Sequence, residues 1–338
     1  MKKNPKTAVI VLNWNGYEDT VECLNSLKKT DYQKHKVILV DNGSDNEEGQ
    51  RLKQRFPEVH LIQNKFNRGF AGGNNDGINW ALKNDFDYIV NLNNDCLVEK
   101  DWLTRLIEGM IKSHADFGTP RIMFYPEKDI IYSDGDVLIP DGTGRAVRHL
   151  QEYSRSRSII PIFSACGAGS IYSRKCLERI KIKGGQYFDE LYFAYFEDLD
   201  LGMRLKACDF NGVALRESVV YHKCSRTAGR YSYFNRYQMD KNRMLNVLLN
   251  FPAKWWIPAE LFYWIKPLIR IFKFADSDNH RHDYIESIGI FKSISAMIKA
   301  RWWILTNLGS IISDRVERNS KKMIDPDIYK NFDWSFGS

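Results

Sequence analysis

Polar residues that could bind a charged ligand follow three apolar segments in the first hundred residues. Asn13 and Asn15 follow the first segment, Asp41 follows the second, and Asn93–Asp95 follows another. A carboxylate at the end of a strand can hold a hard metal cation, or accept a hydrogen bond from a base or a ribose hydroxyl. Taken singly, each group could instead form a turn, because Asp-Asn-Gly and related sequences are common turn formers.

A glycine-rich loop and an acidic helix start supply two further groups of candidate residues. Residues 67–77 contain four glycines and open a helical pattern, so their backbone N–H groups could face a phosphate. This loop matches neither the Walker nor the Rossmann pattern and could also be a flexible capped loop. Glu197, Asp198 and Asp200 begin a second helix, where a carboxylate could remove a proton from a hydroxyl. Acids at that position also stabilise the helix through its dipole.

The residues on either side of this acidic helix are further candidates for a binding or metal site. Residues 187–196 are rich in aromatic side chains, which suit either the wall of a sugar-binding cleft or a plain core. His222 ends the strand that follows the helix, and imidazole is a common metal ligand. His222 could therefore complete a metal site with Asp95, or it could be an isolated histidine.

Alternating strands and helices must position these residues. Short apolar runs predict buried strands, at residues 8–12, 37–40, 59–62 and 88–92. Helical spacing predicts helices between them, at residues 17–29, 47–56 and 71–83. Such alternation indicates an α/β fold with a mostly parallel central sheet flanked by helices, which binds ligands outside the carboxyl ends of its strands.

The rest of the chain predicts a small antiparallel excursion and then a C-terminal helical segment. Residues 115–172 contain short β-like runs separated by Gly, Pro, Asp and Ser, at 130–132, 137–139 and 159–163. Further helices are predicted at 174–180 and 197–208, with a strand at 213–221, and the pattern is helical from about 231 to 313. We therefore predict a catalytic domain at residues 1–228 and a basic, aromatic-rich helical region at residues 229–338.

Charge and tryptophan content separate these two regions. The 338 residues carry 49 basic and 42 acidic side chains, a net charge of +7. Residues 225–338 hold 18 basic and 11 acidic side chains, so all of the net charge lies there, together with six of the nine tryptophans. The six cysteines lack Cys-x-x-Cys spacing, which predicts reduced thiols in a cytosolic protein. The sequence contains no uncharged apolar stretch of about 18 residues, so it predicts no membrane-spanning helix.

Seven segments in this order resemble the family 2 glycosyltransferases with the GT-A fold, and most closely their rhamnosyltransferase-like branch. The segments lie within residues 7–245 and read VIVLNWNG, ILVDNGSDN, NRGFAGGNNDGI, VNLNNDC, SACGAGSIYSRKCLERI, FDELYFAYFEDLDLGMRLK and VVYHKCS. The resemblance implies a GT-A domain that moves a sugar from a nucleotide-sugar donor to an acceptor hydroxyl, with inversion at the anomeric carbon.

The resemblance also implies roles for particular residues. The donor-binding positions of the family fall on Asn13, Asn15, Asp41, Asn67, Gly69, Asn75, Asn93 and Asn94. The metal-binding acid falls on Asp95, with His222 as a second ligand, and the ion would be Mn²⁺ or Mg²⁺. Asn93 replaces the first acid of the family's Asp-x-Asp motif, so one negative charge fewer faces the ion. The general base falls on Asp198, with Glu197 beside it.

The implied substrates follow from the same branch of the family. The donor would be dTDP-L-rhamnose, with galactofuranose, hexose and N-acetylhexosamine donors as alternatives on the same fold. The acceptor would be a growing bacterial surface glycan, or one carried on polyprenyl diphosphate. A nucleotidyltransferase and a catalytically silent glycan-binding or membrane-binding module are the rival interpretations.

Basic and aromatic residues are interleaved in the C-terminal region, at 254–273 and 292–303. This pattern suits an amphipathic helix on an anionic membrane surface, with Lys266, Arg270 and Lys273 among its cations. It equally suits a helical cap on the catalytic domain or a homodimer interface, and these alternatives can coexist. We expect no nucleic-acid partner beside a GT-A core, and a cytoplasmic protein that is peripheral on the inner face of the cell membrane.

Overall fold

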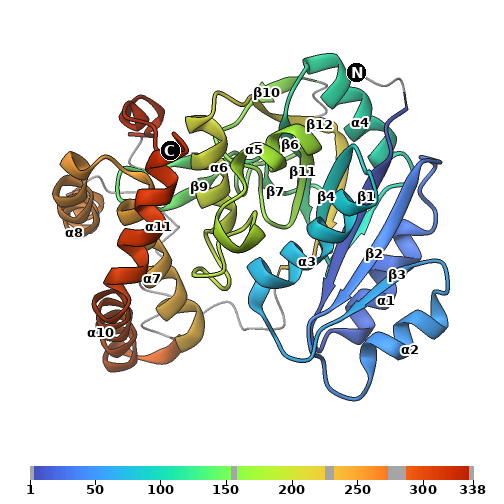
Figure 1. The fold of residues 1–338 in the computed structure, drawn as a ribbon, viewed down its shortest axis with the longest axis horizontal. Coiled ribbons are helices and arrows are strands. Elements are labelled where there is room, and N and C mark those ends of the chain that lie inside the picture. The colour runs from blue at the N-terminus through green and yellow to red at the C-terminus, as the bar shows by residue number, and fades with distance from the viewer. Residues whose placement is uncertain (1–3, 154–157, 225–231, 273–286, 335–338) are drawn as a thin grey trace.

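The structure is a computed structural model, and it describes residues 4–153, 158–224, 232–272 and 287–334 (Figure 1). Its strands are β1 (Thr7–Asn13), β2 (His35–Asp41), β3 (His60–Gln63), β4 (Tyr88–Asn93), β5 (Cys96–Val98), β6 (Phe117–Phe124), β7 (Ile131–Ser133), β8 (Asp136–Leu138), β9 (Gly144–Ala146), β10 (Ile159–Pro161), β11 (Gly169–Ser173) and β12 (Gly212–His222). Its first six helices are α1 (Tyr17–Leu27), α2 (Glu48–Arg55), α3 (Gly69–Lys83), α4 (Trp102–Ser113), α5 (Arg174–Ile180) and α6 (Glu197–Ala207). The C-terminal helices are α7 (Tyr233–Asn250), α8 (Trp256–Phe272), α10 (Ile290–Thr306) and α11 (Leu308–Ser320).

A mixed sheet of ten strands forms the centre of the molecule. Its main path runs β10-β12-β6-β11-β4-β1-β2-β3, while β5 pairs with β12 and β7 pairs with β6. The first four strands pair in parallel, and β11 is antiparallel to both β4 and β6. A separate hairpin joins β8 to β9. The predicted parallel sheet with a small antiparallel excursion is therefore confirmed.

The two faces of this sheet pack into two different cores. Val9 and Val11 of β1 lie in the core that contains the apolar residues of α1 and α4. Ala8 and Ile10 lie in the core formed with α3, α5 and α6. Because successive side chains of a strand point to opposite faces, a strand covered on both sides must be apolar at every position. That requirement explains the continuous apolar runs from which these strands are predicted.

The register of the parallel strands brings their polar ends together. Asn13 lies opposite Asp41, and Leu12 lies opposite Asn93. The end of β12 also reaches this edge, because His222 lies opposite Cys96 of β5. The polar residues that follow separate strands therefore share one edge of the sheet, as the α/β pattern predicts.

The C-terminal helices lie together on the side of the molecule opposite β2 and β3 (Figure 1). Residues of α7, α8 and α6 share one apolar cluster, and residues of α7, α10 and α11 share another. The predicted division at residue 228 falls outside the described residues and stays a prediction. Among the described residues, no helix combines the length and the apolar character needed to cross a bilayer.

Candidate active site

A closed hydrogen-bond cluster joins the carboxyl ends of β1 and β2. Asn13 Nδ2 lies 2.9 Å from Asp41 Oδ1, 3.0 Å from Ser44 Oγ and 3.1 Å from Glu48 Oε2. The other carboxylate oxygen of Asp41 accepts from the Gln63 amide. Asn13 and Asp41 are fully buried. Their polar groups are thus used inside the cluster, and their predicted contact with the donor remains a prediction.

The loop after β1 is tied to the loop after β2 at the surface beside this cluster. The Asn15 backbone N–H donates to Ser44 Oγ over 2.9 Å. The Asp45 backbone N–H donates to Asn15 Oδ1 over 2.8 Å, and Asn15 Nδ2 donates back to Asp45 Oδ2 over 3.2 Å. Asn15 is exposed. Of the predicted donor-binding residues Asn13, Asn15 and Asp41, it is therefore the one that a ligand can reach without opening the cluster.

The glycine-rich loop leads into α3 and is anchored to the segment before α6. Gly69 has φ +71°, and a Cβ atom there would lie 2.3 Å from the Phe193 carbonyl oxygen, so only glycine fits. Asn67 Oδ1 accepts from the Gly69 N–H over 2.7 Å. Asn75 Oδ1 accepts from both backbone N–H groups of residues 187–188 at 3.0 Å. Asn75 thus joins two segments, and its contact with the donor remains a prediction.

Asp95 and His222 form a buried pair where β12 meets β5. His222 Nε2 lies 3.2 Å from Asp95 Oδ1, and the nitrogen makes no well-aligned hydrogen bond within the described residues. Together with Cys96, the two side chains form a group whose ligand atoms all lie within 4.8 Å of one another. Mn²⁺ and Mg²⁺ prefer oxygen and nitrogen ligands to sulfur. The Cys96 thiol lies 3.5 Å from the Ala168 carbonyl oxygen, so Asp95 and His222 are the fitting ligands.

The charge balance of this pair also suits a cation. Burial alone would lower the pKa of His222, but the adjacent Asp95 carboxylate outweighs burial and raises the pKa of His222 to about 10. Some positive charge, either a proton or a metal ion, therefore belongs between the two side chains. Nearby, Asn94 Nδ2 donates to Thr20 Oγ1 over 2.9 Å, which directs that amide toward α1.

Asp198 lies in the first turn of α6 with its carboxylate held by two backbone groups. The Gly167 N–H donates to Asp198 Oδ2 and the Leu199 N–H donates to Oδ1, each over 2.8 Å. Burial raises the pKa of Asp198, and these hydrogen bonds oppose the rise because they favour the ionised form. The chain enters the helix through a turn in which Tyr195 and Phe196 both have positive φ, a conformation that costs free energy in residues other than glycine.

Two neighbouring carboxyl groups hold their protons more strongly than an ordinary acid. Glu197 is buried, and its Oε2 has no hydrogen-bond partner among the described residues. Burial, followed by the charge of Asp198, raises the pKa of Glu197 well above its usual value. The pKa of Asp136 is raised well above its usual value by the same two causes in the same order. Asp198 is therefore the acid of this group that ionises most readily.

Asp136 and the segment that contains Gly167 were not predicted as part of the site. Asp136 pairs through its backbone with Ser164, at 2.9 and 3.1 Å, and Ser164 Oγ donates to the Asp198 carbonyl over 2.7 Å. The run of residues 133–136 is polar between β-like segments, which was the available signal for Asp136. Gly167 lies in the segment SACGAGSIYSRKCLERI, which contributes to the family resemblance, but its contact with Asp198 spans 31 residues and could not be predicted from that segment.

The segment of residues 166–168 brings the acids and the Asp95–His222 pair together. The Gly167 N–H holds Asp198, while the carbonyl of the next residue, Ala168, accepts from the Asn93 N–H over 3.1 Å. Consecutive Cα atoms are about 3.8 Å apart, so the two groups are close neighbours. The Tyr132 ring also packs edge-on against the His222 ring, with centroids 5.0 Å apart. A proton acceptor and a fitting cation site thus share one edge of the sheet.

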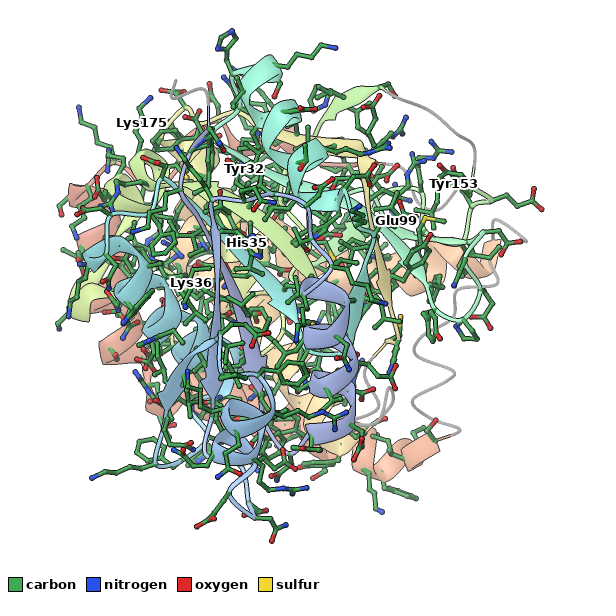
Figure 2. All side chains as sticks on the ribbon, turned by 90° about the vertical axis from the view of Figure 1, so that its right-hand side faces the viewer. Tyr32, His35, Lys36, Glu99, Tyr153 and Lys175 are labelled. Carbon is green, nitrogen blue, oxygen red and sulfur yellow. The ribbon has the colours of Figure 1, made fainter. Side chains whose placement is uncertain are left out.

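A separate depression of about 620 Å³ lies at the opposite end of the strands and is not part of this site. His35 and Lys36, which begin β2 and are labelled in Figure 2, line this depression. Trp80 and Phe86 are also among its lining residues. Asp41 ends the same strand, about 20 Å away at 3.3 Å per residue.

Two curated relatives are each 23% identical to the chain. One is the low-salt glycan biosynthesis hexosyltransferase Agl10 of Haloferax volcanii, matched over 209 residues, which are 60% of this chain and 62% of that protein. The other is glycosyltransferase GlyG of Streptococcus pneumoniae serotype 4, matched over 194 residues, 54% of this chain and 62% of that protein. The chain thus spans about three fifths of the length of these relatives.

Two solved structures have the same fold at low sequence identity. GalNAc-T7, crystallised with UDP, GalNAc and Mn²⁺, gives a TM-score of 0.60 at 14% identity and covers 85% of this chain and 57% of its own. Residues 1–349 of S. aureus TarS give a TM-score of 0.52 at 15% identity, and the match covers 96% of this chain and 91% of the TarS chain. The family model of glycosyl transferase family 2 matches residues 8–181, just over half of the chain. The chain therefore belongs to glycosyl transferase family 2 and has the GT-A fold.

Proposed function

We propose that the chain transfers a sugar from a nucleotide-sugar donor to an acceptor hydroxyl with inversion, and that Asp198 is the general base. One observation carries this proposal: the Asp198 carboxylate is held by two N–H groups. Burial and then the charge of Asp198 raise the pKa of both Glu197 and Asp136 well above the usual value. Groups whose environments separate their pKa values are suited to different acid and base roles. Asp198 is the member of the group best suited to accept a proton at neutral pH.

The proposed reaction balances in a single displacement. The acceptor hydroxyl gives its proton to the Asp198 carboxylate while its oxygen forms a bond to the anomeric carbon. The bond between that carbon and the diphosphate oxygen breaks on the opposite face, and its electron pair leaves with the nucleoside diphosphate. Asp95 and His222 would hold a divalent cation, which supplies positive charge to the leaving diphosphate. Donor hydrolysis that persists unchanged in excess EDTA would contradict this role of the pair.

The identity of the donor sugar is a finer proposal. The sequence motifs resemble those of rhamnosyltransferases, which favours dTDP-L-rhamnose. The relative Agl10 is named as a hexosyltransferase, and GalNAc-T7 was crystallised with UDP, GalNAc and Mn²⁺, so hexose and N-acetylhexosamine donors are the specific alternatives. The residues proposed to bind the donor are those predicted at the strand ends and in the glycine-rich loop. Release of nucleoside diphosphate from a panel of nucleotide sugars would identify the donor, and release from UDP-sugars alone would exclude rhamnose.

The proposed acceptor is a bacterial surface glycan or a glycan on a polyprenyl-diphosphate carrier. This places the proposed reaction in the cytoplasm at the inner face of the cell membrane. The C-terminal helical region, residues 229–338, is also proposed as a homodimer interface. A catalytically silent binding module is the alternative, and any turnover of a nucleotide sugar would exclude it.

Replacement of the proposed base tests the mechanism directly. Asp198→Asn keeps the shape of the side chain and removes its ability to accept a proton. We expect the rate of sugar transfer to fall by about 10²–10⁴-fold while donor binding, measured by thermal shift, persists. Asp209→Asn is the matched control, because Asp209 is an exposed acid just beyond the other end of α6. A near-normal rate in Asp198→Asn would exclude Asp198 as the base and point to Glu197 or Asp136.

A further inference from the structure

A continuous stripe of apolar side chains is exposed along α10 and α11. On α10 the stripe residues are between 47% and 86% exposed and consist of Phe291, Ile294, Ile298, Trp302 and Leu305. On α11 the stripe continues through Leu308, Ile312 and Val316. The spacing of three and four residues places all of them along one side of their helices. Exposed apolar side chains are ordinary when scattered singly, but a contiguous patch of this kind marks an interaction surface.

The opposite faces of the same helices are packed, which fixes the direction of the stripe. Ala296, Ala300 and Ile304 of α10 are buried, as is Ile311 of α11. Ile304 and Ile311 pack in the cluster that includes Leu245 and Leu249 of α7. The helices therefore do act as a cap on the rest of the chain through their buried faces. That cap leaves the stripe exposed. The two helices that carry the stripe lie on the side of the molecule opposite β2 and β3 (Figure 1).

The charge beside the α10 part of the stripe is entirely positive, whereas on α11 the acids Asp314 and Glu317 lie beside Arg315 and Val316. Residues 290–313 contain three basic side chains and no acidic one. Lys292 and Lys299 are exposed, whereas Arg301 pairs with Glu260 at 3.2 Å. Lys266, predicted from the sequence as a membrane-facing cation, instead pairs with Asp141 at 3.2 Å. The predicted cations Arg270 and Lys273 lie outside the side chains that the structure describes.

We propose that the α10–α11 stripe docks on the anionic surface of a phospholipid bilayer, with both helices lying in the interface. Tryptophan, phenylalanine and aliphatic side chains beside lysines are the composition that such helices need. A second copy of the chain fits less well, because a symmetric contact along α10 would bring Lys292 and Lys299 near their counterparts, and α10 has no acidic side chain to offset them. The inference goes beyond the proposed function, since this contact requires neither the donor nor Asp198.

Vesicle flotation of the full chain tests the docking surface without any substrate. We expect the protein to float with vesicles of equal parts phosphatidylglycerol and phosphatidylcholine at about 0.05 M salt, and to be released at about 0.5 M salt. Pure phosphatidylcholine vesicles should bind it much less. Failure to float with the anionic vesicles at low salt would overturn the proposal. Equal binding to both vesicle types at both salt concentrations would overturn the assignment to an anionic surface.

Paired variants locate the contact on the chain. The triple variant Phe291→Ser, Ile298→Ser, Trp302→Ser should lower vesicle binding by at least about tenfold, because each inserted side chain contributes hydrophobic free energy. Lys292→Gln with Lys299→Gln should lower it by roughly 25-fold, about fivefold for each cation near the surface. The control is Phe66→Ser, since Phe66 is 67% exposed but lies in the catalytic half and should not affect vesicle binding.

Two further measurements separate this proposal from its alternatives. The triple variant should release nucleoside diphosphate from the donor at the wild-type rate, so a loss of vesicle binding is not a loss of the fold. An inactive wild type that still floats would contradict the proposed function and leave the docking surface standing. A wild-type mass that doubles with concentration, and no longer doubles in the triple variant, would assign the stripe to a second copy and overturn the membrane proposal.

Discussion

At the carboxyl end of β1, the side chains of Asn13 and Asp41 are fully buried and contact one another. They also contact four neighbouring polar side chains, those of Thr20, Ser44, Glu48 and Gln63. At the start of α6, Glu197 is almost as deeply buried, yet its Oε2 has no partner among the described residues. The first cluster satisfies its polar groups with its own side chains. The second leaves a carboxyl group to hold a proton.

This difference separates a rigid part of the site from a reactive part. A satisfied buried network costs little and holds its shape, so it suits a frame for a ligand. An acid that is buried without partners has a raised pKa, and such groups gather where protons are moved. The comparison therefore supports our proposal that the donor binds at the ends of β1 and β2 and that the chemistry takes place at the start of α6.

A buried ionic network around Arg318 contacts the first turn of α6. Arg318 of α11 is 1% exposed and contacts Asp200 at 2.5 Å, Asp189 at 2.6 Å and Asn250 at 2.6 Å. Asp200 lies two residues after the proposed base, and the guanidinium groups of Arg204 and Arg318 outweigh burial to lower the pKa of Asp200 to about 2. A helix outside the matched family segment therefore fixes the position of α6.

The largest effect is expected for Arg318→Met. Removing one partner of a buried ion pair costs about 3–5 kcal/mol, because Asp189 and Asp200 would lose a compensating charge. For a chain of this length the melting temperature should fall by roughly 4–7 °C. We also expect a lower rate of sugar transfer at saturating donor, since α6 would shift, with partial recovery in Arg318→Lys. Differential scanning calorimetry and steady-state kinetics measure the two effects.

The matched control for this variant is Arg243→Met. Arg243 is equally buried and pairs with Glu260 at 2.6 Å, but its contacts lie away from the start of α6. It should lower the melting temperature and leave turnover of the remaining folded protein unchanged. If Arg243→Met and Arg318→Met lower turnover equally, the network serves stability alone and does not position Asp198.

The two parts of the site also differ in how well the sequence predicts them. The strands of the parallel half were predicted to within a few residues because burial on both faces makes them continuously apolar. The polar residues at their ends were predicted for the same local reason. The partners of Asp198 were not, because Gly167 lies 31 residues away and the ion pair of Arg318 with Asp189 spans 129 residues. Contacts between residues so far apart in the sequence can be identified only once the fold is known.

A smaller effect is expected for Asp41→Asn in the satisfied cluster. The new amide would place a donor against the Asn13 and Gln63 amides, which are donors themselves. Leaving such groups unsatisfied costs about 1–3 kcal/mol, which lowers the melting temperature by roughly 1–4 °C. We expect the KM for the donor to rise with little change in kcat. The exposed Asp45→Asn is the control and should leave stability unchanged. A selective loss of kcat in Asp41→Asn would place chemistry at the strand ends and reverse the comparison.

The smallest loss is expected for Glu197→Gln, because this change should stabilise the protein by an amount that depends on pH. The pKa of Glu197 is raised well above 4.5 in the folded chain by burial and by the charge of Asp198. Above that pH the unfolded state loses its proton more readily than the folded state, so this group makes the wild type less stable as pH rises through the interval between the two pKa values. Glutamine does not titrate and fills the same space. The variant should therefore match the wild type near pH 4 and exceed it at pH 7–8, by about 1 kcal/mol or more for each unit by which the folded pKa is raised, or roughly 1–2 °C in melting temperature. Thermal unfolding across this pH range measures the gap. A gap that is constant with pH, or that widens toward acid, would mean that Glu197 is ionised in the folded protein and that the start of α6 is as well satisfied as the ends of β1 and β2.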